Sequence, residues 1–363
     1  MPFQSSLLEQ ALQEIVSPSE DSFKAANVRL DSLVKPPQSL GHLETMAARL
    51  MAIQQQPVLS VEKRCVIVLA ADNGVVAEGV SSAPQAVTAL QTINILNGLA
   101  GVSVLSRQFA ADLMVVDVGV ASDLDHPDLV RRKIRPSTGN IAREPALTPA
   151  EVIQALETGL DLAREAKSNG YQVLGVGEMG IGNTTTSSAV LAGLLGYGPG
   201  QVEALVGRGA GLSDADFHHK VSVIEQALQL HQPDANDVLD VLAKVGGLDL
   251  ATMTGVYLGA AASRLPVAID GFISVVAALC AVRLAPAVRD YLFASHQSYE
   301  RGYAVAIREL DLPTPLQLDM RLGEGSGCPL LFALMDAAVA IYHNMGTFSA
   351  GGIDLEYTEE ITF

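Results

Sequence analysis

The length, composition and charge of the chain exclude several classes of protein. It has 363 residues, of which 49% are hydrophobic and 17% charged, so we expect a large folded core rather than extended disorder. The formal net charge is −17, from 23 basic and 40 acidic side chains. Nucleic acids and anionic membranes are bound through clustered Lys and Arg, and the electrostatic field of a protein with this negative charge repels both. We therefore expect neither as a partner, and a phosphate-bearing substrate must be held by local donors.

The cysteines and the apolar runs indicate a reduced, cytoplasmic protein. Cys65, Cys280 and Cys328 are far apart and form no C-x-x-C pair, which argues against a disulfide scaffold and against a Cys-rich zinc site. The first residues, MPFQSSLLEQ, lack the basic-then-apolar pattern of a signal peptide. Charged side chains interrupt the most apolar stretch, 248–288, so no run reaches the roughly 20 residues that span a bilayer.

In chain order, the sequence predicts helices, then alternating strands and helices, then a final helix. Residues 5–54 have apolar positions at helical spacing, with a loop at 35–41. Continuous apolar runs typical of buried parallel strands follow, at 64–72, 111–120, 171–182, 265–271 and 291–296. Helices are predicted at 86–101, 148–170, 184–195 and 272–284, and again from 328. This alternation predicts an α/β fold with a parallel sheet and right-handed crossovers.

Ligands of open parallel sheets bind beyond the carboxyl ends of the strands, so the polar residues there are the first candidates for a site. They are Asp72-Asn73-Gly74, Asp117, Gly177-Glu178-Met179-Gly180, Asp270-Gly271 and Ser295-His296, to which we add the loop 321–327. Glu178 and Glu324 each lie among glycines, which let a ligand approach the backbone closely. Asn183 and the threonines after it are predicted to cap a helix whose first N–H groups face an anion. The alternative for each glutamate is a structural carboxylate at a helix start.

Several other motifs favour different functions or none. Gly175-x-Gly177-x-x-Gly180 matches the dinucleotide fingerprint and leaves a nucleotide-dependent oxidoreductase as an alternative. That fingerprint needs a second strand ending in an acidic residue about 20 positions on, whereas here a helix is followed by 196–200. No phosphate-binding P-loop and no H-E-x-x-H motif is present, and His218-His219 fits a solvated helix face, so we expect no metal. Lys220 is either a solvated lysine or a phosphate ligand.

Six motifs occur in the same order as in one family. They are Lys35-Pro36-Pro37 with Ser39-Leu40-Gly41 and Leu43-Glu44, Ala71-Asp72-Asn73-Gly74-Val75, Gly177 to Thr185, Asp270-Gly271-Phe272, Ser295-His296 and Arg321 to Gly327. Over about residues 30 to 350, the chain resembles the nicotinate-nucleotide:dimethylbenzimidazole phosphoribosyltransferases, which build the lower-ligand nucleotide of cobalamin.

The resemblance implies an activity and a set of site residues. The reaction moves the phosphoribosyl group of nicotinate mononucleotide to 5,6-dimethylbenzimidazole, giving α-ribazole 5′-phosphate and nicotinate, with no cofactor and no metal. Glu324 is similar to the general base of the family, and Glu178 to a second carboxylate near the reacting centre. The residues implied to hold the nucleotide and its phosphate are Gly180, Asn183, Gly209, Lys220 and Ser298. Those implied to bind the aromatic base are Ala83, Gln91, Met179 and Leu322.

The resemblance also implies an architecture and leaves alternatives open. It implies a homodimer with a Rossmann-like α/β domain over 61–325 and a small helical domain built from 1–60 and 326–363. Asn73 stands where the family usually has His, Gln38 where it usually has Gly, and Ala83 where a small polar residue often lines the base pocket. The last departure leaves open another benzimidazole, adenine or a phenolic acceptor. A homologue that binds a base without turning it over is a further alternative.

Overall fold

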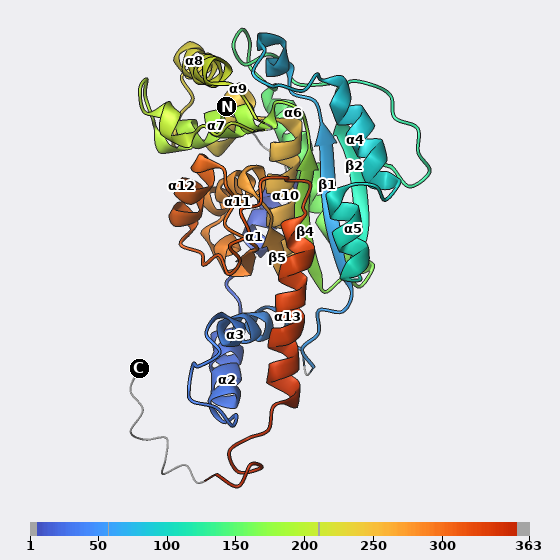
Figure 1. Cartoon of the computed structure of the whole chain (residues 1–363), viewed down its shortest axis with the longest axis vertical. Coiled ribbons are helices and arrows are strands. Elements are labelled where there is room, and N and C mark those ends of the chain that lie inside the picture. The colour runs from blue at the N-terminus through green and yellow to red at the C-terminus, as the bar shows by residue number, and fades with distance from the viewer. Residues whose placement is uncertain (1–5, 57, 210, 354–363) are drawn as a thin grey trace.

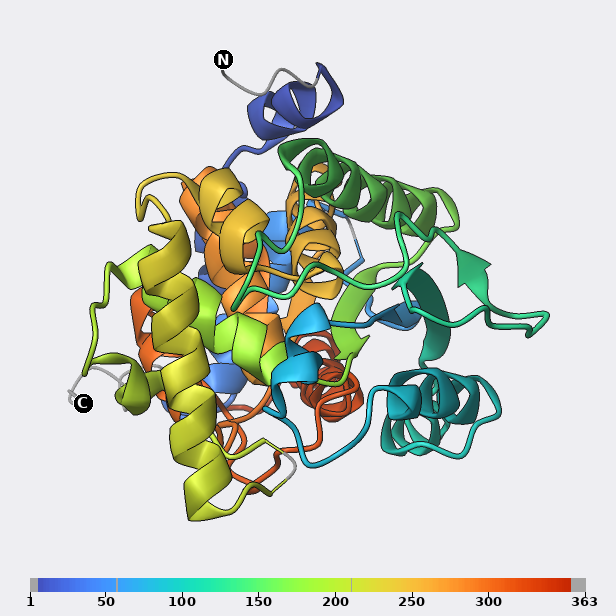
Figure 2. The ribbon, with the colours of Figure 1, turned by 90° about the horizontal axis from the view of Figure 1, so that it is seen from above.

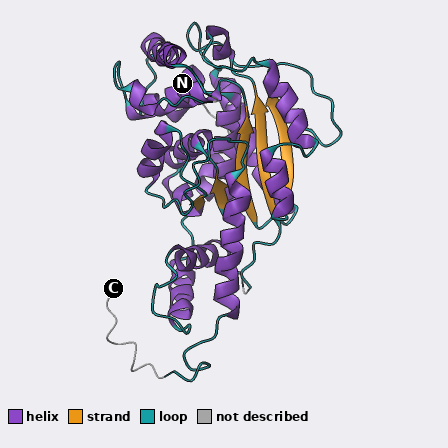
Figure 3. Cartoon of the chain, in the orientation of Figure 1, coloured by secondary structure: helices purple, strands orange, loops and turns teal. Residues whose placement is uncertain are grey.

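The computed structural model describes residues 6–56, 58–209 and 211–353, and its centre is one parallel sheet (Figure 3). The strands are β1 (Arg64–Ala71), β2 (Asp112–Gly119), β3 (Val130–Arg131), β4 (Val173–Met179), β5 (Val267–Ile269) and β6 (Leu292–Ala294). They lie in the order β3-β2-β1-β4-β5-β6, and all five pairings are parallel. Every residue of β1 and β4 is buried, which explains their continuous apolar runs. The predicted α/β parallel sheet is confirmed.

Helices cover both faces of the sheet. They are α1 (Ser6–Glu14), α2 (Glu20–Asp31), α3 (His42–Gln54), α4 (Ala86–Leu96), α5 (Gly101–Gln108), α6 (Pro149–Ser168), α7 (Asn183–Leu195), α8 (Asp214–His231), α9 (Val238–Val245), α10 (Leu248–Ala262), α11 (Phe272–Leu284), α12 (Arg301–Leu310) and α13 (Gly327–Asn344). The helices α10 and α11 pack on one face, and α4, α5 and α13 pack on the other (Figure 2). This arrangement makes the sheet doubly wound. From β1 the next strands, β2 and β3, are added on one side, whereas β4, β5 and β6 are added on the other, so the strand order reverses between β1 and β4. Such a switch point is where α/β sheets bind ligands.

The most extensive contact between two described helices, that of α6 with α10, depends on glycine. A Cβ at Gly159 of α6 would lie 2.1 Å from the carbonyl oxygen of Thr252 on α10, and one at Gly255 would lie 2.1 Å from that of Leu156. Only residues without a side chain let the two backbones come this close. The helix α10 is therefore held between α6 and the sheet, with all but its C-terminal residue Ala262 buried.

The helix α13 extends past the sheet and packs there against the N-terminal helices. It begins at the carboxyl ends of the strands, whereas Asp336 in its middle pairs with Arg64 at the start of β1 (2.8 Å). Its last eight residues, at about 1.5 Å each, extend beyond the amino ends of the strands. The helices α2 and α3 lie beside this lower half of α13 (Figure 1). The first helix, α1, packs instead against α6 and α10, so the helices before β1 contribute to two different parts of the molecule.

The loop 35–41 that precedes α3 is fixed by a buried ion pair. Lys35 Nζ lies 2.6 Å from Glu44 Oε2, and Glu44 Oε1 accepts the N–H of Leu40 at 2.9 Å. Gln38 has a φ of +59°, a left-handed conformation that favours glycine. This conformation agrees with the glycine that the resemblance implies at this position.

The prediction of a single helix over 86–101 is wrong at its C-terminal end. The helix α4 ends at Leu96, Gly98 has a φ of +78°, and a second helix, α5, runs from Gly101 to Gln108. A glycine in the left-handed conformation is a common helix terminator. The stretch Ala86–Gln108 is long and apolar enough to cross a membrane, with 33% of its most apolar window buried. The turn at 97–100 divides it, so this is weak evidence for a membrane span. The two-residue strand β3 was not predicted.

Candidate active site

The polar strand ends converge at the switch point of the sheet. The strand β4 ends with Glu178 and Met179, next to the Asp72-Asn73 pair that follows β1. The loop 321–327 lies directly on β4, since a Cβ at Gly177 would be 2.3 Å from the carbonyl oxygen of Glu324. Asp270, after β5, ties the same loop down: its two oxygens accept the N–H groups of Gly325 (3.0 Å) and Gly327 (2.6 Å). Glu178 and Glu324, 146 positions apart in sequence, are thereby neighbours.

Glu324 has a strained backbone conformation, and both oxygens of its side chain accept hydrogen bonds. Its φ is +63°, between Gly323 at +82° and Gly325 at +92°. A non-glycine residue in this region costs about 1–2 kcal/mol, so the surrounding bonds must fix it. Oε1 accepts the side-chain N–H of Gln91 at 2.6 Å, and Oε2 accepts the backbone N–H of Val102 at 3.2 Å. Each oxygen of the Glu324 carboxyl group therefore has an N–H donor that fixes its position.

Glu178 lies in a cluster of buried carboxyl groups. The side-chain N–H of Asn183 donates to Glu178 Oε2 and, at 3.1 Å, to Oδ2 of Asp249. Burial raises the pKa of Glu178 to about 8, and the charges of Asp249 and Asp270 add to that rise. Burial likewise raises the pKa of Asp270 to about 7 and that of Asp249 to about 6. Glu178 in the ligand-free protein therefore carries a proton near neutral pH.

The prediction that Asn183 caps α7 is wrong. The N-cap position is Gly182, with a φ of +89°, and no side chain caps the helix. Asn183 is the first helical residue, and its amide bridges Glu178 and Asp249 instead. The first bonds of α7 are made by the backbone, because the carbonyl of Gly182 accepts the N–H groups of Thr185 and Thr186. The partner that redirects Asn183 lies 66 positions later in the sequence.

Three of the predicted phosphate ligands lie together around Lys220. We call the cluster of buried carboxyl groups around Glu178 the first pole of the site and this group around Lys220 the second pole. Lys220 of α8 is buried, and its Nζ donates to Thr184 Oγ1 (2.8 Å) and to the Gly207 carbonyl (3.3 Å). Gly209 lies beside it, since a Cβ at Gly209 would be 3.9 Å from Lys220 Nζ. The Ser298 hydroxyl accepts the N–H of Glu300 at 3.5 Å. Burial lowers the pKa of Lys220 to about 8.

Gly180 and Asn183 link the two poles. A Cβ at Gly180 would lie 2.5 Å from the Ala71 carbonyl oxygen and 3.0 Å from Asp249 Oδ2, so glycine is required at this crossing of β1 and β4. Asn183 is bonded to Glu178, and the next residue, Thr184, is bonded to Lys220. The turn from β4 into α7 thus connects the carboxyl cluster with the lysine.

The predicted base-binding residues are less uniform in position. Gln91 of α4 contacts Glu324 directly, and Met179 is buried at the end of β4. Leu322 is 58% exposed and lies over Gly101, where a Cβ would be 2.5 Å from its Cδ2. Ala83 is half-buried, and its N–H is bonded to Ser81 Oγ at 3.2 Å. No contact recorded in the described residues joins Ala83 to the two glutamates.

Two of the departures from the family pattern, Asn73 and Gln38, lie in different parts of the molecule. Asn73 is fully buried at the switch point, where its Oδ1 accepts the Thr186 hydroxyl at 3.2 Å. Its Nδ2 has no hydrogen-bond partner within the described residues. Asn73 is therefore part of the site, whereas Gln38 lies in the loop before α3.

The glycines of the dinucleotide-like pattern have a different role in the structure. Gly175 and Gly177 lie inside β4, where a Cβ would be 2.6 Å from Cys328 Cβ and 2.3 Å from the Glu324 carbonyl oxygen, respectively. They permit α13 and the loop before it to pack on the strand. They do not form a phosphate-binding turn, so the oxidoreductase alternative loses its only motif.

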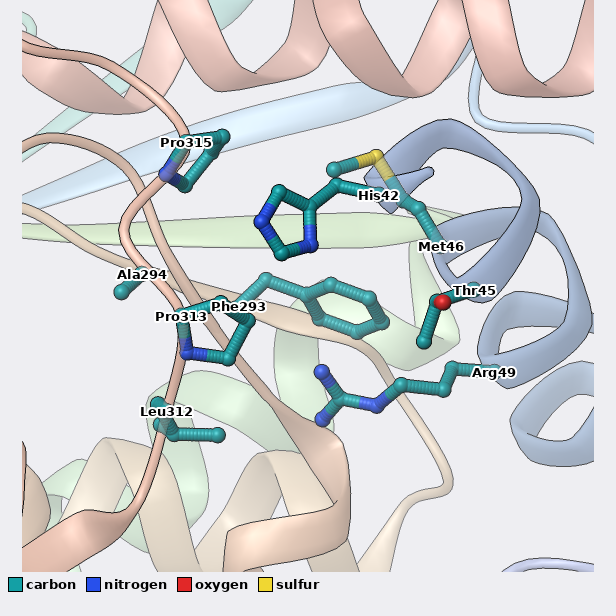
Figure 4. Close-up of a pocket in the computed structure, with 9 residues that line it drawn as sticks. All are labelled: His42, Thr45, Met46, Arg49, Phe293, Ala294, Leu312, Pro313 and Pro315. Carbon is teal, nitrogen blue, oxygen red and sulfur yellow. The ribbon is translucent and has the colours of Figure 1, made fainter. Parts of the chain in front are cut away.

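The pocket drawn in Figure 4 lies elsewhere and holds none of the predicted site residues. It is formed where α3 meets β6 and the segment 312–315, and is lined by His42, Thr45, Met46, Arg49, Phe293, Ala294, Leu312, Pro313 and Pro315. The guanidinium of Arg49 lies 4.2 Å from the centre of the Phe293 ring and donates to the Leu292 carbonyl at 2.7 Å. Because carboxylates and converging hydrogen-bond donors lie at the strand ends instead, we place the active site there.

Two residues of the site have no signal in the sequence. Asp249 begins an apolar helix and is wholly buried behind Asn183. Glu300 precedes α12, and its Oε1 accepts the N–H of Gly209 at 3.1 Å. Both act through partners that are remote in sequence, and neither belongs to a glycine loop.

A site of this kind, with buried carboxylates and a buried lysine at the switch point of a Rossmann-like sheet, is typical of enzymes acting on nucleotides. The comparisons are more specific. A family model described as Phosphoribosyltransferase matches residues 15–353, and the chain belongs to this family. A nicotinate-nucleotide–dimethylbenzimidazole phosphoribosyltransferase of Clostridium perfringens is 49% identical over 355 residues, 98% of each protein.

Another relative and a solved structure agree. The protein of that name from Geobacter sulfurreducens is 47% identical over 348 residues, covering 96% of this chain and 98% of the relative. The crystal structure of the enzyme of that name from Thermus thermophilus matches with a TM-score of 0.86 at 42% identity. The match covers 93% of this chain and 99% of that one.

Proposed function

We propose that this protein transfers the phosphoribosyl group of nicotinate mononucleotide to 5,6-dimethylbenzimidazole, in the assembly of the nucleotide loop of cobalamin. The near full-length identity to enzymes of that name supports the donor and the acceptor. Within the structure, the observation that carries the proposal is the pairing of Glu324 with Glu178 at the switch point.

The chemistry suits two glutamates. The donor is a pyridinium nucleotide, so breaking the bond from the ribose C1′ to the ring nitrogen returns the electron pair to nitrogen and releases nicotinate with a neutral ring. The acceptor nitrogen forms the new bond to C1′ and loses its N–H proton. A direct displacement inverts the β-nucleotide, so the product is α-ribazole 5′-phosphate.

Glu324 is the general base in this proposal. Its oxygens are fixed by Gln91 and Val102, so the carboxylate is oriented before the substrate binds. A positioned base contributes about 10²–10⁴-fold to the rate. Among the other base-side residues, Gln91 orients Glu324, while Met179, Leu322 and Ala83 shape the acceptor pocket.

Glu178 is the second carboxylate, and substrate binding sets its charge. In the ligand-free protein, burial holds its pKa at about 8. An opposite charge nearby favours the ionised carboxylate, so the positively charged pyridinium ring of the donor promotes ionisation of Glu178 when it binds. The charge is then present where the ribosyl centre becomes cationic.

The nucleotide phosphate binds, in this proposal, at the second pole of the site. Gly209 and Lys220 supply an N–H and an ammonium group, Ser298 supplies a hydroxyl, and Gly180 with Asn183 forms the turn between the poles. These donors are local, as the net charge of −17 requires.

We further propose a cytoplasmic homodimer. Its small helical domain comes from the segments 1–60 and 326–363, through α2, α3 and α13, whereas α1 packs on the large domain. Exposed apolar side chains on α4 and α5 support an interface, because Leu90 is 64% and Val104 50% exposed. Light scattering of the purified protein should give twice the mass of the 38.1 kDa chain. A mass of one chain at micromolar concentration would contradict the dimer. Residues 354–363 lie outside the described residues.

The test of the activity is a panel of acceptors. The protein is incubated with nicotinate mononucleotide and dimethylbenzimidazole, benzimidazole, adenine or p-cresol, and nicotinate and ribotide are quantified by chromatography. The highest efficiency with dimethylbenzimidazole is expected. Efficiency highest with another base would keep the reaction and change the acceptor, whereas no nicotinate release with any base would overturn the enzyme assignment.

A further inference from the structure

Glu300 contacts two of the residues proposed to bind phosphate. Its Oε1 accepts the N–H of Gly209 at 3.1 Å, and its own N–H is bonded to Ser298 Oγ at 3.5 Å. Of the groups proposed to bind the nucleotide phosphate, the Gly209 N–H is thus bonded to the carboxylate of Glu300, and the Ser298 hydroxyl is bonded to the backbone N–H of Glu300. A carboxylate resembles a phosphate in charge and in the donors that it accepts.

The backbone is shaped to receive this carboxylate. A Cβ at Gly207 would lie 1.4 Å from Glu300 Oε2, so no other residue type leaves room for the side chain in this position. Oε2 is buried and has no hydrogen-bond partner within the described residues. A buried carboxylate oxygen without a donor is costly, so the bond from Gly209 stabilises Glu300 only in part.

Lys220 faces the same space. It forms no ion pair under 4.0 Å with a carboxylate in the part of the chain that the structure describes. Its pKa is lowered by burial to about 8, and the charge of Glu300 opposes that fall. Glu300 is therefore the anionic group that the buried ammonium senses, at a separation too long for a direct contact. A phosphate would serve as a closer counter-ion.

We propose that the Glu300 carboxylate occupies the binding position of the nucleotide phosphate in the ligand-free enzyme and thereby selects against free inorganic anions. This inference rests on the proposed function, which places the phosphate of the donor at Gly209 and Lys220. A free phosphate must displace Glu300 with only the contacts that Lys220, Gly209 and Ser298 offer to the phosphate itself. A nucleotide also binds through its ribose and its ring, so it can displace the carboxylate.

The test is the affinity for inorganic phosphate, measured by calorimetric titration. Glu300→Gln removes the charge and keeps an oxygen that can accept the Gly209 N–H. Because the variant removes a negative charge from the position where phosphate binds, the Kd for phosphate is expected to fall about tenfold, equivalent to ~1.4 kcal/mol. Glu309→Gln, which removes the same charge near the C-terminal end of α12, is the matched control and should leave this Kd unchanged.

Two further variants define the outcome. Glu300→Ala is expected to bind phosphate more tightly than the wild type, and adding Lys220→Met to Glu300→Gln should abolish the gain. An unchanged or weaker affinity in Glu300→Gln, or a gain that survives the loss of Lys220, would overturn the inference. Weaker binding in Glu300→Ala alone would assign Glu300 a purely structural role and overturn it as well.

The titration separates this inference from the proposed function. Phosphate binding is measured without turnover, so it remains informative if the wild type shows no transferase activity. If transfer proceeds and Glu300→Gln binds phosphate no more tightly, only the role of Glu300 fails. Inhibition of transfer by phosphate is a second readout, and its Ki should fall in parallel with the Kd.

Discussion

At the scale of single residues, Glu324 and Glu178 differ in the groups that surround their carboxyl oxygens. Glu324 accepts the N–H groups of Gln91 and Val102. Glu178 shares the amide of Asn183 with Asp249, accepts the N–H of Glu324 at 3.4 Å, and lies near the buried carboxyl groups of Asp249 and Asp270. Burial near other carboxyl groups favours the neutral form of Glu178. This contrast predicts different consequences when each is changed to glutamine.

Glu324→Gln should lose about 10²–10⁴-fold in kcat, because an amide cannot take the acceptor proton. The KM for nicotinate mononucleotide should change little, since Glu324 acts on the acceptor. Steady-state kinetics with both substrates varied would measure this. Glu62→Gln, at an exposed position before β1, is the control. Turnover within a few-fold of the wild type would refute the general-base role.

Glu178→Gln should change how stability depends on pH. The pKa of Glu178 is about 8 in the folded protein against 4.5 ordinarily, so the folded state binds the extra proton between these values. Stability therefore falls as pH rises through this window, since the unfolded state binds fewer protons there. An amide has no proton to lose, so the Tm of the variant relative to the wild type should be higher at pH 8 than at pH 5. The same Tm difference at both pH values would contradict the buried, protonated carboxyl.

At the scale of elements, Arg49 joins α3 to the edge of the sheet. Besides stacking on Phe293, it donates to the carbonyls of Asp290 (3.2 Å) and Leu292 (2.7 Å). Arg49→Ala leaves these acceptors unpaired, which should lower the free energy of unfolding by about 1–3 kcal/mol. Denaturant titration measures the loss, and Arg49→Lys, which keeps the charge without the planar fork, should lose less. A stability equal to the wild type would show that α3 is held against the edge of the sheet without this contact.

The elements also show what the sequence could and could not predict. The strands β1 and β4 were predictable because their continuous apolar runs reflect burial on both faces, and parallel topology then places Glu178 and Asp270 at one edge. The break between α4 and α5 was missed because apolar residues continue through it, although Asn97-Gly98 marks it. Asn183 was misread because an amide at a helix start serves equally well as a cap or as a bridge. Only Asp249, brought close by the packing of α10, decides between the two.

At the scale of the whole molecule, α13 connects the chemistry to the small helical cluster. Its first residue, Gly327, is bonded to Asp270 at the site, and its far half packs against α3. A rigid helix fixed at both ends holds the strained loop around Glu324 in place. The position of Glu324 therefore depends on contacts formed at both ends of the sheet.

The net charge of the whole molecule predicts an unusual salt dependence. An anionic nucleotide approaches a protein of charge −17, and this repulsion is screened as the Debye length falls from about 30 Å at 0.01 M salt to about 8 Å at 0.15 M. The kcat/KM for nicotinate mononucleotide should therefore rise severalfold over this range, whereas the KM for the neutral base stays constant. Potassium gluconate is the salt of choice, because its bulky anion competes poorly for the Lys220 pole. A fall in kcat/KM with salt would mean that the buried lysine and its neighbours govern the encounter, and that the acidic surface lies too far from the strand ends to oppose it.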